Sequence, residues 1–412
     1  MRSNPIICLA AVSAAFFSPV ASAGSNDALL DILVRKGILT ESEAAEVSRE
    51  LETEAQVEKA SGETGLRIKA KGKETVGLSF SGRMQGQWDH LGMEEDGVSL
   101  PTANHFYFRR LFFGVKAELE SGIYAETVLD FAGDDGPEIG FDKAHFGYEF
   151  SDRLTAEFGY QKVPFGFEET TSSSKLPTIE RSAANRFFAD DIDFSARHTG
   201  VHASGDLGAG FGYAVALVNA AQGEGSRLLG ASNASNDMAV FGRVQWERNG
   251  LTLGVDAGGQ PNNDVVAQRD PAGNPTVDDF DITAFTGYAN YKFEGLNLLG
   301  EYFSADMDDA GDAEGYALRA SYRVGKFEPV VRYTRLKTDS FEVDSDELIR
   351  RAPEGGTLGG TDNEIDSYYL GAAYYFSRAV TFMLGYEFAR TENDAGDEVE
   401  IDGARARIQV VW

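Results

Sequence analysis

The chain has 412 residues, of which 42% are hydrophobic, with 46 glycines, 11 prolines and a formal net charge of −29. Outside the N-terminus no window of about 18 consecutive apolar residues occurs, which excludes a helix that crosses ~30 Å of hydrocarbon. Two classes remain, a soluble protein and a membrane β-barrel.

Residues 1–23 have the pattern of a secretory signal peptide. Arg2 precedes the apolar stretch PIICLAAVSAAFFSPV, and ASA at 21–23 fits an A-x-A cleavage site, so we expect an exported chain that begins at Gly24. Cys8 is the single cysteine and lies in the segment to be removed, so the mature chain is expected to have no disulfide or thiol chemistry. A buried N-terminal helix is the alternative.

Residues 24–62 predict a periplasmic helical hairpin or coiled-coil segment. After Gly37, Thr40 and Glu43 form a capping box that opens a second helix. The apolar positions of that helix recur at spacings of three and four, a narrow stripe that suits a partner helix: Ala44, Val47, Leu51 and Ala55. Two interpretations stay open, a contact with peptidoglycan or another periplasmic subunit, and a plain spacer.

From residue 76 onward the hydrophobic period changes from about 3.6 to 2. In VGLSFSGRMQGQWD, Val76, Leu78 and Phe80 share one face, and the polar residues share the other. Tight turns alternate with longer acidic loops along the rest of the chain. Sixteen such runs are expected, near 76–89, 105–120, 122–132, 140–150, 153–162, 197–205, 210–219, 237–247, 250–260, 280–293, 296–304, 314–324, 327–337, 365–376, 379–390 and 402–412.

This pattern predicts an all-β fold, a 16-stranded antiparallel transmembrane β-barrel over residues 76–412. A soluble sandwich or propeller would place its polar face outward, and its closed core gives no reason for arginines to repeat opposite the aromatics. Trp88, Phe150 and Trp412 lie near strand ends, as an interfacial girdle in contact with outer-membrane lipid requires. The stretch FDITAFTGYANYKFEGLNLLGEYF is apolar in both phases, so the register of the tenth and eleventh strands stays open.

The segment between the fifth and sixth runs breaks the alternation. Because a sixteen-stranded lumen is too wide for wall side chains to fill, we expect this third external loop to fold inward and narrow the channel. A mobile surface loop fits poorly with its aromatic content. The candidate constriction residues are Lys162, Phe165, Glu168, Glu169, Lys175, Arg181 and Arg186.

Inward basic residues are the candidates for selectivity, because guanidinium groups stay charged and bind oxyanions in a bidentate fork. The alternative is a charge balance with lumen acids that only orients water and solute. External acids such as Asp308 and Asp309 repel anions over about one Debye length, ~8 Å. The candidate pore-lining residues are Arg83, Arg110, Lys116, Arg319, Arg323, Arg332, Arg405 and Arg407.

Other chemistry is sparse. His198 and His202 are separated by ~13 Å along a strand, too far for one metal ion, and DMDDAGDAEG is a weak calcium motif. No Gly-rich phosphate loop or nucleophile elbow occurs. We therefore expect no catalytic residues, metal, cofactor or nucleic-acid partner; a hydrolase with a Ser/His pair on the outer wall is the remaining enzyme hypothesis.

The sequence FGYQKVPFGFEETTSSSKLPTIERS, which follows FRRLFFGVKAELESG, resembles the phosphate-selective porins O and P of bacterial outer membranes. The resemblance covers roughly residues 76–412. It implies a homotrimer of sixteen-stranded barrels, each a water-filled channel with an inward-folded third loop, for passive diffusion of small hydrophilic solutes and ions, with phosphate among them. The alternatives are a general or cation-preferring porin and a non-conducting anchor linked to the cell wall.

Overall fold

The expected signal peptide (1–23) and helical hairpin (24–62) lie outside the residues that this structure, a computed structural model, describes. Those residues are 65–69, 75–132, 139–221, 237–270, 273–358 and 362–412. Among them, no helix is both long and apolar enough to cross a membrane.

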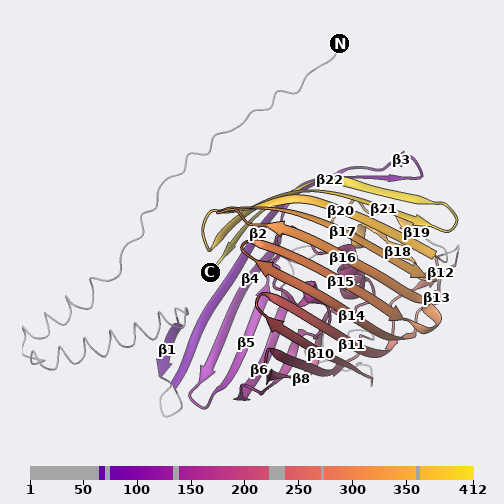
Figure 1. The fold of residues 1–412 in the computed structure, drawn as a ribbon. Helices are drawn as coiled ribbons and strands as arrows, with labels where there is room; N and C mark the ends of the chain where they lie inside the picture. The colour runs from indigo at the N-terminus through magenta and orange to yellow at the C-terminus, as the bar shows by residue number, and fades with distance from the viewer. Residues whose placement is uncertain (1–64, 70–74, 133–138, 222–236, 271–272, 359–361) are drawn as a thin grey trace, which may run out of the picture. The chain divides into compact units, whose positions relative to one another are not determined.

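Sixteen antiparallel strands form a closed barrel, and each coincides with one of the predicted runs (Figure 1). Consecutive strands pair with each other, and β2 closes the ring by pairing with β22 from Arg83↔Val411 to Glu95↔Val399. The barrel strands are β2 (Thr75–Glu95), β4 (Ala103–Leu119), β5 (Ile123–Asp130), β6 (Gly140–Ser151), β7 (Leu154–Lys162), β8 (Arg197–Gly208), β9 (Phe211–Asn219), β10 (Met238–Arg248), β11 (Leu251–Asn263), β14 (Phe280–Phe293), β15 (Leu296–Asp306), β16 (Asp312–Tyr322), β17 (Phe327–Asp339), β20 (Asp362–Tyr375), β21 (Val380–Asn393) and β22 (Glu398–Val411).

The closing seam is joined at the C-terminus. Gly82 and Trp412 exchange two backbone hydrogen bonds of 3.0 and 3.1 Å, and the indole ring occupies the space that a Cβ at Gly82 would need. Because the strands are staggered, the part of β2 that precedes Arg83 extends past the last residue pair with β22. A short strand that the alternation did not predict, β1 (Gly65–Lys69), pairs with residues 75–79 of β2 at this end.

The period-two pattern separates a polar lumen from an apolar outer face, as predicted. On β2, the inward Gln85 and Asp89 are fully buried, whereas the outward Phe80 is 47% exposed. One irregularity shifts the alternation: between Gln85/Gly86 the register of β2 and β4 slips by one residue at Arg109. This β-bulge turns both Arg109 and Arg110 inward, where the former bonds Glu180 and the latter bonds Gln85.

The structure resolves the register of the tenth and eleventh barrel strands, β14 and β15, which pair as Tyr288↔Glu301. Ile282 and Ala284 point inward and are buried, and Phe285 points outward and is 46% exposed. Both faces are apolar here because the inward face packs on a folded loop instead of water.

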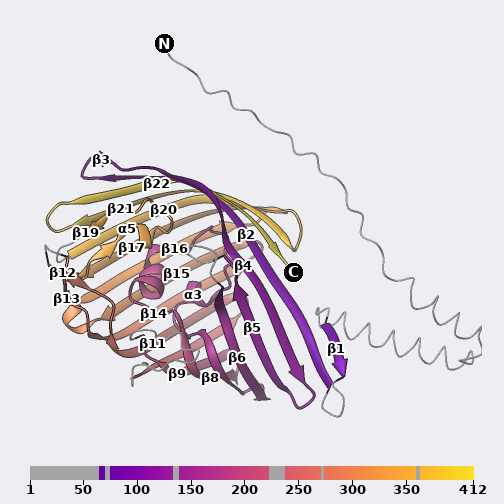
Figure 2. The same cartoon turned by 180° about the vertical axis from the view of Figure 1, so that it is seen from behind.

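The remaining elements belong to the connections on the long-loop side of the barrel (Figures 1 and 2). The segment between β7 and β8, residues 163–196, is called the inner loop below. It contains α3 (Phe167–Thr170), α4 (Ala183–Arg186) and η2 (Phe187–Asp191). The other short elements are β3 (Val98–Ser99), β12 (Gln268–Arg269), β13 (Pro275–Val277), η4 (Asp308–Ala310), β18 (Val343–Asp344), α5 (Ser345–Leu348) and β19 (Thr357–Leu358).

Candidate functional site: the constriction beside the inner loop

The inner loop packs its aromatic side chains against one half of the barrel wall. The Phe165 ring lies 5.0 Å from that of Phe194 and 6.4 Å from that of Phe303 on β15, and Phe188 stacks on Phe303 at 5.1 Å. These side chains are fully buried. Burial of several aromatic rings supplies the main driving force for this placement, since each removes a large apolar area from water.

Two carboxylates of the inner loop form ion pairs with arginines of the barrel wall. Glu168 pairs with Arg319 of β16 at 2.8 Å. Glu180 accepts bonds from Arg109 of β4, at 3.1 Å, and from Arg407 of β22. Burial alone would raise the pKa of the Glu180 carboxyl, but Arg109 and Arg407 hold it well below its usual range. The loop is therefore joined to the wall by ion pairs that contain buried, ionised groups.

Two carboxylates of the wall hold the start of α3. Asp256 of β11 accepts the backbone N–H of Gly166 at 2.9 Å and pairs with Arg243 at 2.6 Å. Glu301 of β15 accepts the backbone N–H groups of Phe167 and Glu168. Gly166 has a φ of 79°, in the left-handed region that favours glycine, so a larger residue there would strain this turn.

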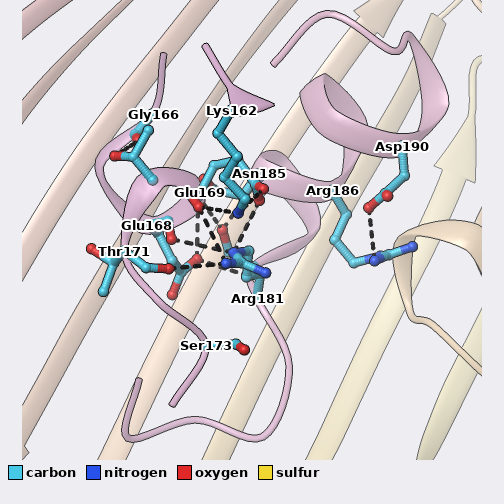
Figure 3. Close-up of polar contacts among 12 residues, drawn as sticks. Lys162, Gly166, Glu168, Glu169, Thr171, Ser173, Arg181, Asn185, Arg186 and Asp190 are labelled. Carbon is cyan, nitrogen blue, oxygen red and sulfur yellow. Dashed lines mark hydrogen bonds and ion pairs between the residues drawn. The ribbon is translucent and has the colours of Figure 1, made fainter. Parts of the chain in front are cut away.

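The edge of the inner loop that faces the open part of the lumen carries basic side chains, and we call it the basic edge. Glu169 lies between Lys162 of β7 and Arg181, whose Nε is 2.9 Å from the carboxylate (Figure 3). Arg181 also donates to the backbone carbonyl of Thr171 at 3.0 Å. Burial alone would raise the pKa of Glu169, but Arg181 and Lys162 lower it to about 2. Glu169 is therefore a fixed anion between two cations.

Two more arginines extend this edge. Arg83 of β2 donates to the hydroxyl groups of Ser172 and Ser173 at 2.8 and 2.7 Å, and its guanidinium lies 5.1 Å from the Phe112 ring. Arg197 at the start of β8 pairs with Asp142 of β6. Among the described residues, Arg83 has no ion pair with a carboxylate.

A cavity of about 1280 Å³ lies between this basic edge and the wall formed by β2 and β4 to β8. The facing wall carries acids: Glu126 pairs with Lys143 at 2.7 Å, and Glu157 accepts a bond from Tyr124 at 2.6 Å. The side of the lumen behind the inner loop is filled by packed side chains. The cavity therefore has a basic edge on one side and acids on the facing wall.

The structure separates the eight sequence-predicted pore-lining residues into three sets. Arg83 and Arg110 line the cavity. Four others are at most 6% exposed because the inner loop covers them: Arg319, Arg332, Arg405 and Arg407. Arg332 and Arg405 share Glu387, at 2.8 and 3.2 Å.

Two predicted pore-lining residues lie elsewhere. Lys116 pairs with Glu118 at 2.5 Å near the β4–β5 turn. Arg323 falls in the predicted run 314–324, but β16 ends at Tyr322, and Arg323 lies exposed in the β16–β17 turn, over the Tyr375 ring at 4.0 Å. The first residues of the turn continue the apolar–polar alternation of β16, so the sequence pattern extends past the end of the strand.

The predicted loop residues come together except for Lys175, whose side chain is exposed. Arg186 pairs with Asp190 at 2.7 Å (Figure 3). It also donates to the backbone carbonyl of Glu347 at 2.7 Å. That contact joins the inner loop to a second loop, residues 340–358. Arg109 was not predicted, because the bulge turns it inward against the alternation of its strand. Arg197 and Lys143 were not selected for the site either, since residue spacing alone gives no signal for them.

The histidines noted in the sequence do not form a metal site. His198 is fully buried, and its Nδ1 forms a hydrogen bond of 2.9 Å with the Asn219 carbonyl. His202 is 7% exposed at the cavity wall. Within the part of the chain that the structure describes, no group of three or more His, Cys, Asp or Glu side chains is arranged to hold a metal ion.

A family model described as phosphate-selective porin O and P matches residues 80–254 and 275–412. No curated protein matches the chain significantly in sequence. Among solved structures, the anion-selective porin from Comamonas acidovorans has a TM-score of 0.57 at 15% identity, over 82% of this chain and 100% of that chain. The outer membrane channel DcaP of Acinetobacter baumannii has a TM-score of 0.56 at 11% identity, over 84% and 99%. The loop L8 deletion mutant of OmpT from Vibrio cholerae has 0.58 at 14%, over 82% and 99%. These likenesses concern the fold.

Proposed function

Since the chain belongs to the phosphate-selective porin O and P family, we propose that its channel favours small anions and that the edge beside the inner loop sets this preference. The protein is a porin of the bacterial outer membrane, a channel through which small hydrophilic solutes diffuse. The proposal concerns which of those solutes it prefers.

An excess of positive charge at the constriction carries the proposal. Four basic side chains, Arg83, Lys162, Arg181 and Arg197, are held there with two carboxylate partners, Glu169 and Asp142. All of them line the same cavity. Charges beside low-dielectric walls are screened less than charges at an open rim, so this excess acts more strongly on a passing ion than the acidic external loops do.

Arg83 is the residue best suited to contact a passing anion. Its guanidinium is held by two serine hydroxyls and forms no ion pair with a carboxylate among the described residues. A guanidinium offers several N–H donors in a fixed plane, which matches carboxylate and phosphate oxygens. Ser172 and Ser173 add hydroxyl groups beside it.

The test is the reversal potential of the purified channel in a planar bilayer under a KCl gradient. Arg83→Gln should shift the reversal potential toward cations, and Arg83→Gln with Lys162→Gln should shift it further. Arg323→Gln, in the exposed turn between β16 and β17, is the matched control and should change nothing. An unchanged potential in the double variant, with normal conductance, would contradict the proposal.

A cation-preferring or general porin is the second candidate, and a specific observation favours it. Glu126, Asp130 and Glu157 line the opposite wall of the same cavity. If these acids govern, Glu126→Gln with Glu157→Gln will shift the potential toward anions by more than the Arg83 and Lys162 changes shift it toward cations.

We also propose that the porin is a homotrimer that acts by diffusion and catalyses no reaction. The OmpT of Vibrio cholerae that is described in a trimer form has a TM-score of 0.52 and 13% identity to this chain. Native mass spectrometry of the detergent-solubilised protein should give the mass of three chains, and bilayer recordings should show conductance in three equal steps. A protein that inserts into the bilayer without conductance steps would favour the non-conducting anchor. A contact of residues 24–62 with peptidoglycan is a separate prediction.

A further inference from the structure

Two oppositely charged side chains of the cavity wall lie close together without pairing. Arg83 of β2 and Asp130 of β5 flank Phe112 of β4, because the strand register places Arg83 opposite Phe112 and Phe112 opposite Asp130. All three residues line the cavity. Two strand spacings separate the Cα atoms of Arg83 and Asp130 by ~10 Å. Within the described part of the chain, neither side chain forms an ion pair.

Neutral groups hold both charges in place. The Asp130 carboxylate accepts the backbone N–H groups of Leu111 and Ala132 on its Oδ1, both at 3.0 Å, and its Oδ2 accepts no bond from the described residues. The Arg83 guanidinium, held by serine hydroxyls of the inner loop, lies 5.1 Å from the Phe112 ring, the residue between the two charges. The wall therefore presents a fixed cation and a fixed anion with a short gap between them.

The floor of this gap is apolar. Phe112 and Val128 face the lumen here and line the cavity, although most inward residues of a water-filled channel are polar. Neither belongs to the core that the inner loop forms with the opposite half of the wall. Val128 lies two residues before Asp130 on the same face of β5. The pair gives the hydrocarbon part of a solute an apolar contact between the two charges.

We propose that Arg83, Asp130 and Phe112 form a subsite for small zwitterions of the α-amino acid class, with the solute carboxylate on Arg83 and its ammonium group on Asp130. Two charge-assisted hydrogen bonds of ~2.8 Å each, added to the short separation of the charged groups in an α-amino acid, fill a gap of this size. Both wall charges are half-buried and unpaired, so a solute that brings both opposite charges binds better than a neutral solute of the same shape. The subsite rests on the proposed contact of Arg83 with anions and adds an acidic contact to it.

The experiment compares L-alanine with its neutral isomer lactamide in proteoliposomes that contain the whole protein. The swelling rate in an isosmotic solution measures the entry of each solute, after subtraction of the rate in protein-free liposomes. The wild type should admit alanine about threefold faster than lactamide. Asp130→Asn and Arg83→Gln should each make the two rates nearly equal. Asp152→Asn, in the exposed β6–β7 turn, is the matched control and should keep the wild-type ratio.

The reversal potential of the same variants under a KCl gradient separates this inference from the proposed anion preference. Asp130→Asn should shift the potential toward anions and Arg83→Gln toward cations, although both variants lower the alanine-to-lactamide ratio. A ratio that falls in both variants at unchanged potentials would contradict the anion preference and support the subsite. Potentials that shift as stated, with the wild-type ratio kept, would overturn the subsite and leave the anion preference intact.

The comparison also tests the two contacts separately. A ratio that falls in only one of the two variants would overturn the paired site. Equal rates for alanine and lactamide in the wild type would overturn it without any variant. Asp130→Asn keeps an oxygen for the two backbone N–H groups, so the barrel should fold, and single-channel conductance checks that each variant has done so.

Discussion

The Glu168 carboxylate and the Arg319 guanidinium lie 2.8 Å apart between the inner loop and β16, and both are almost completely buried. Asn185 of the loop donates to the same carboxylate at 3.2 Å. A buried ion pair costs desolvation when it forms, yet removal of one partner leaves an uncompensated charge. The loop position is therefore sensitive to either residue alone.

Arg319→Met should release the inner loop without unfolding the barrel. The lone Glu168 carboxylate would be destabilised by about 3–5 kcal/mol where it lies, as for other broken buried pairs. We expect a larger and noisier single-channel conductance at an unchanged thermal transition of the barrel.

The double variant Arg319→Met with Glu168→Gln should recover much of the wild-type conductance, because no buried charge is left unpaired. Lys116→Met breaks an exposed pair with Glu118 and serves as the control, since such pairs contribute at most about 1 kcal/mol. If Arg319→Met conducts like the wild type, the loop is held by its aromatic contacts instead.

Replacement of residues 168–192 by a short Gly/Ser linker should widen the channel and leave the barrel folded, because that segment contributes no barrel strand. It should also raise anion selectivity. Arg319 loses its partner Glu168, Arg407 loses its partner Glu180, and both become accessible to solute. Conductance and reversal potential measure the two effects; a folded deletion variant with unchanged conductance would exclude the constriction.

Removal of charge from the external loops should change ion selectivity less than removal of charge from the constriction. Asp308→Asn with Asp309→Asn removes two exposed carboxylates at η4, where salt screens charge beyond ~8 Å. We expect the shift of the reversal potential toward anions in this variant to be smaller than the opposite shift caused by Arg83→Gln. The reverse ranking would mean that the rim governs selectivity.

The sequence predicted the barrel well because one physical rule acts on all of it. Each barrel strand has one face toward lipid, so period-two hydrophobicity marks it wherever the other face is wet. The rule weakened at β14 and β15, where Ile282, Ala284 and Phe303 face the lumen but pack on the inner loop. An apolar inner face there is itself the sequence signal of a covering loop.

The candidate site was predicted only in part, because charge pairing is a tertiary property. Arg405 and Arg407 have the same alternation as Arg83, yet the loop covers the first two and leaves the third at the cavity. Nothing local in the sequence distinguishes them. The bulge at Arg109 also escapes any strict alternation, since it adds one residue to one strand.

The selectivity of the constriction should be nearly constant from pH 5 down to about pH 4. The pKa of Glu169 lies at about 2, below its ordinary value of 4.5, because Arg181 and Lys162 outweigh the effect of burial. A carboxyl whose pKa is depressed in the folded state stabilises the fold fully above its unfolded pKa, and this contribution is lost progressively as the pH falls from 4.5 to about 2. Exposed carboxylates in general titrate near pH 4, so a selectivity set by them would change between pH 5 and 3. Reversal potentials at pH 5, 4 and 3 separate the two, with Glu169→Gln as the comparison. That variant leaves Lys162 and Arg181 without their shared anion and should prefer anions more strongly at every pH. A wild-type potential that moves steadily toward anions between pH 5 and 4 would assign selectivity to exposed acids and not to the edge beside the inner loop.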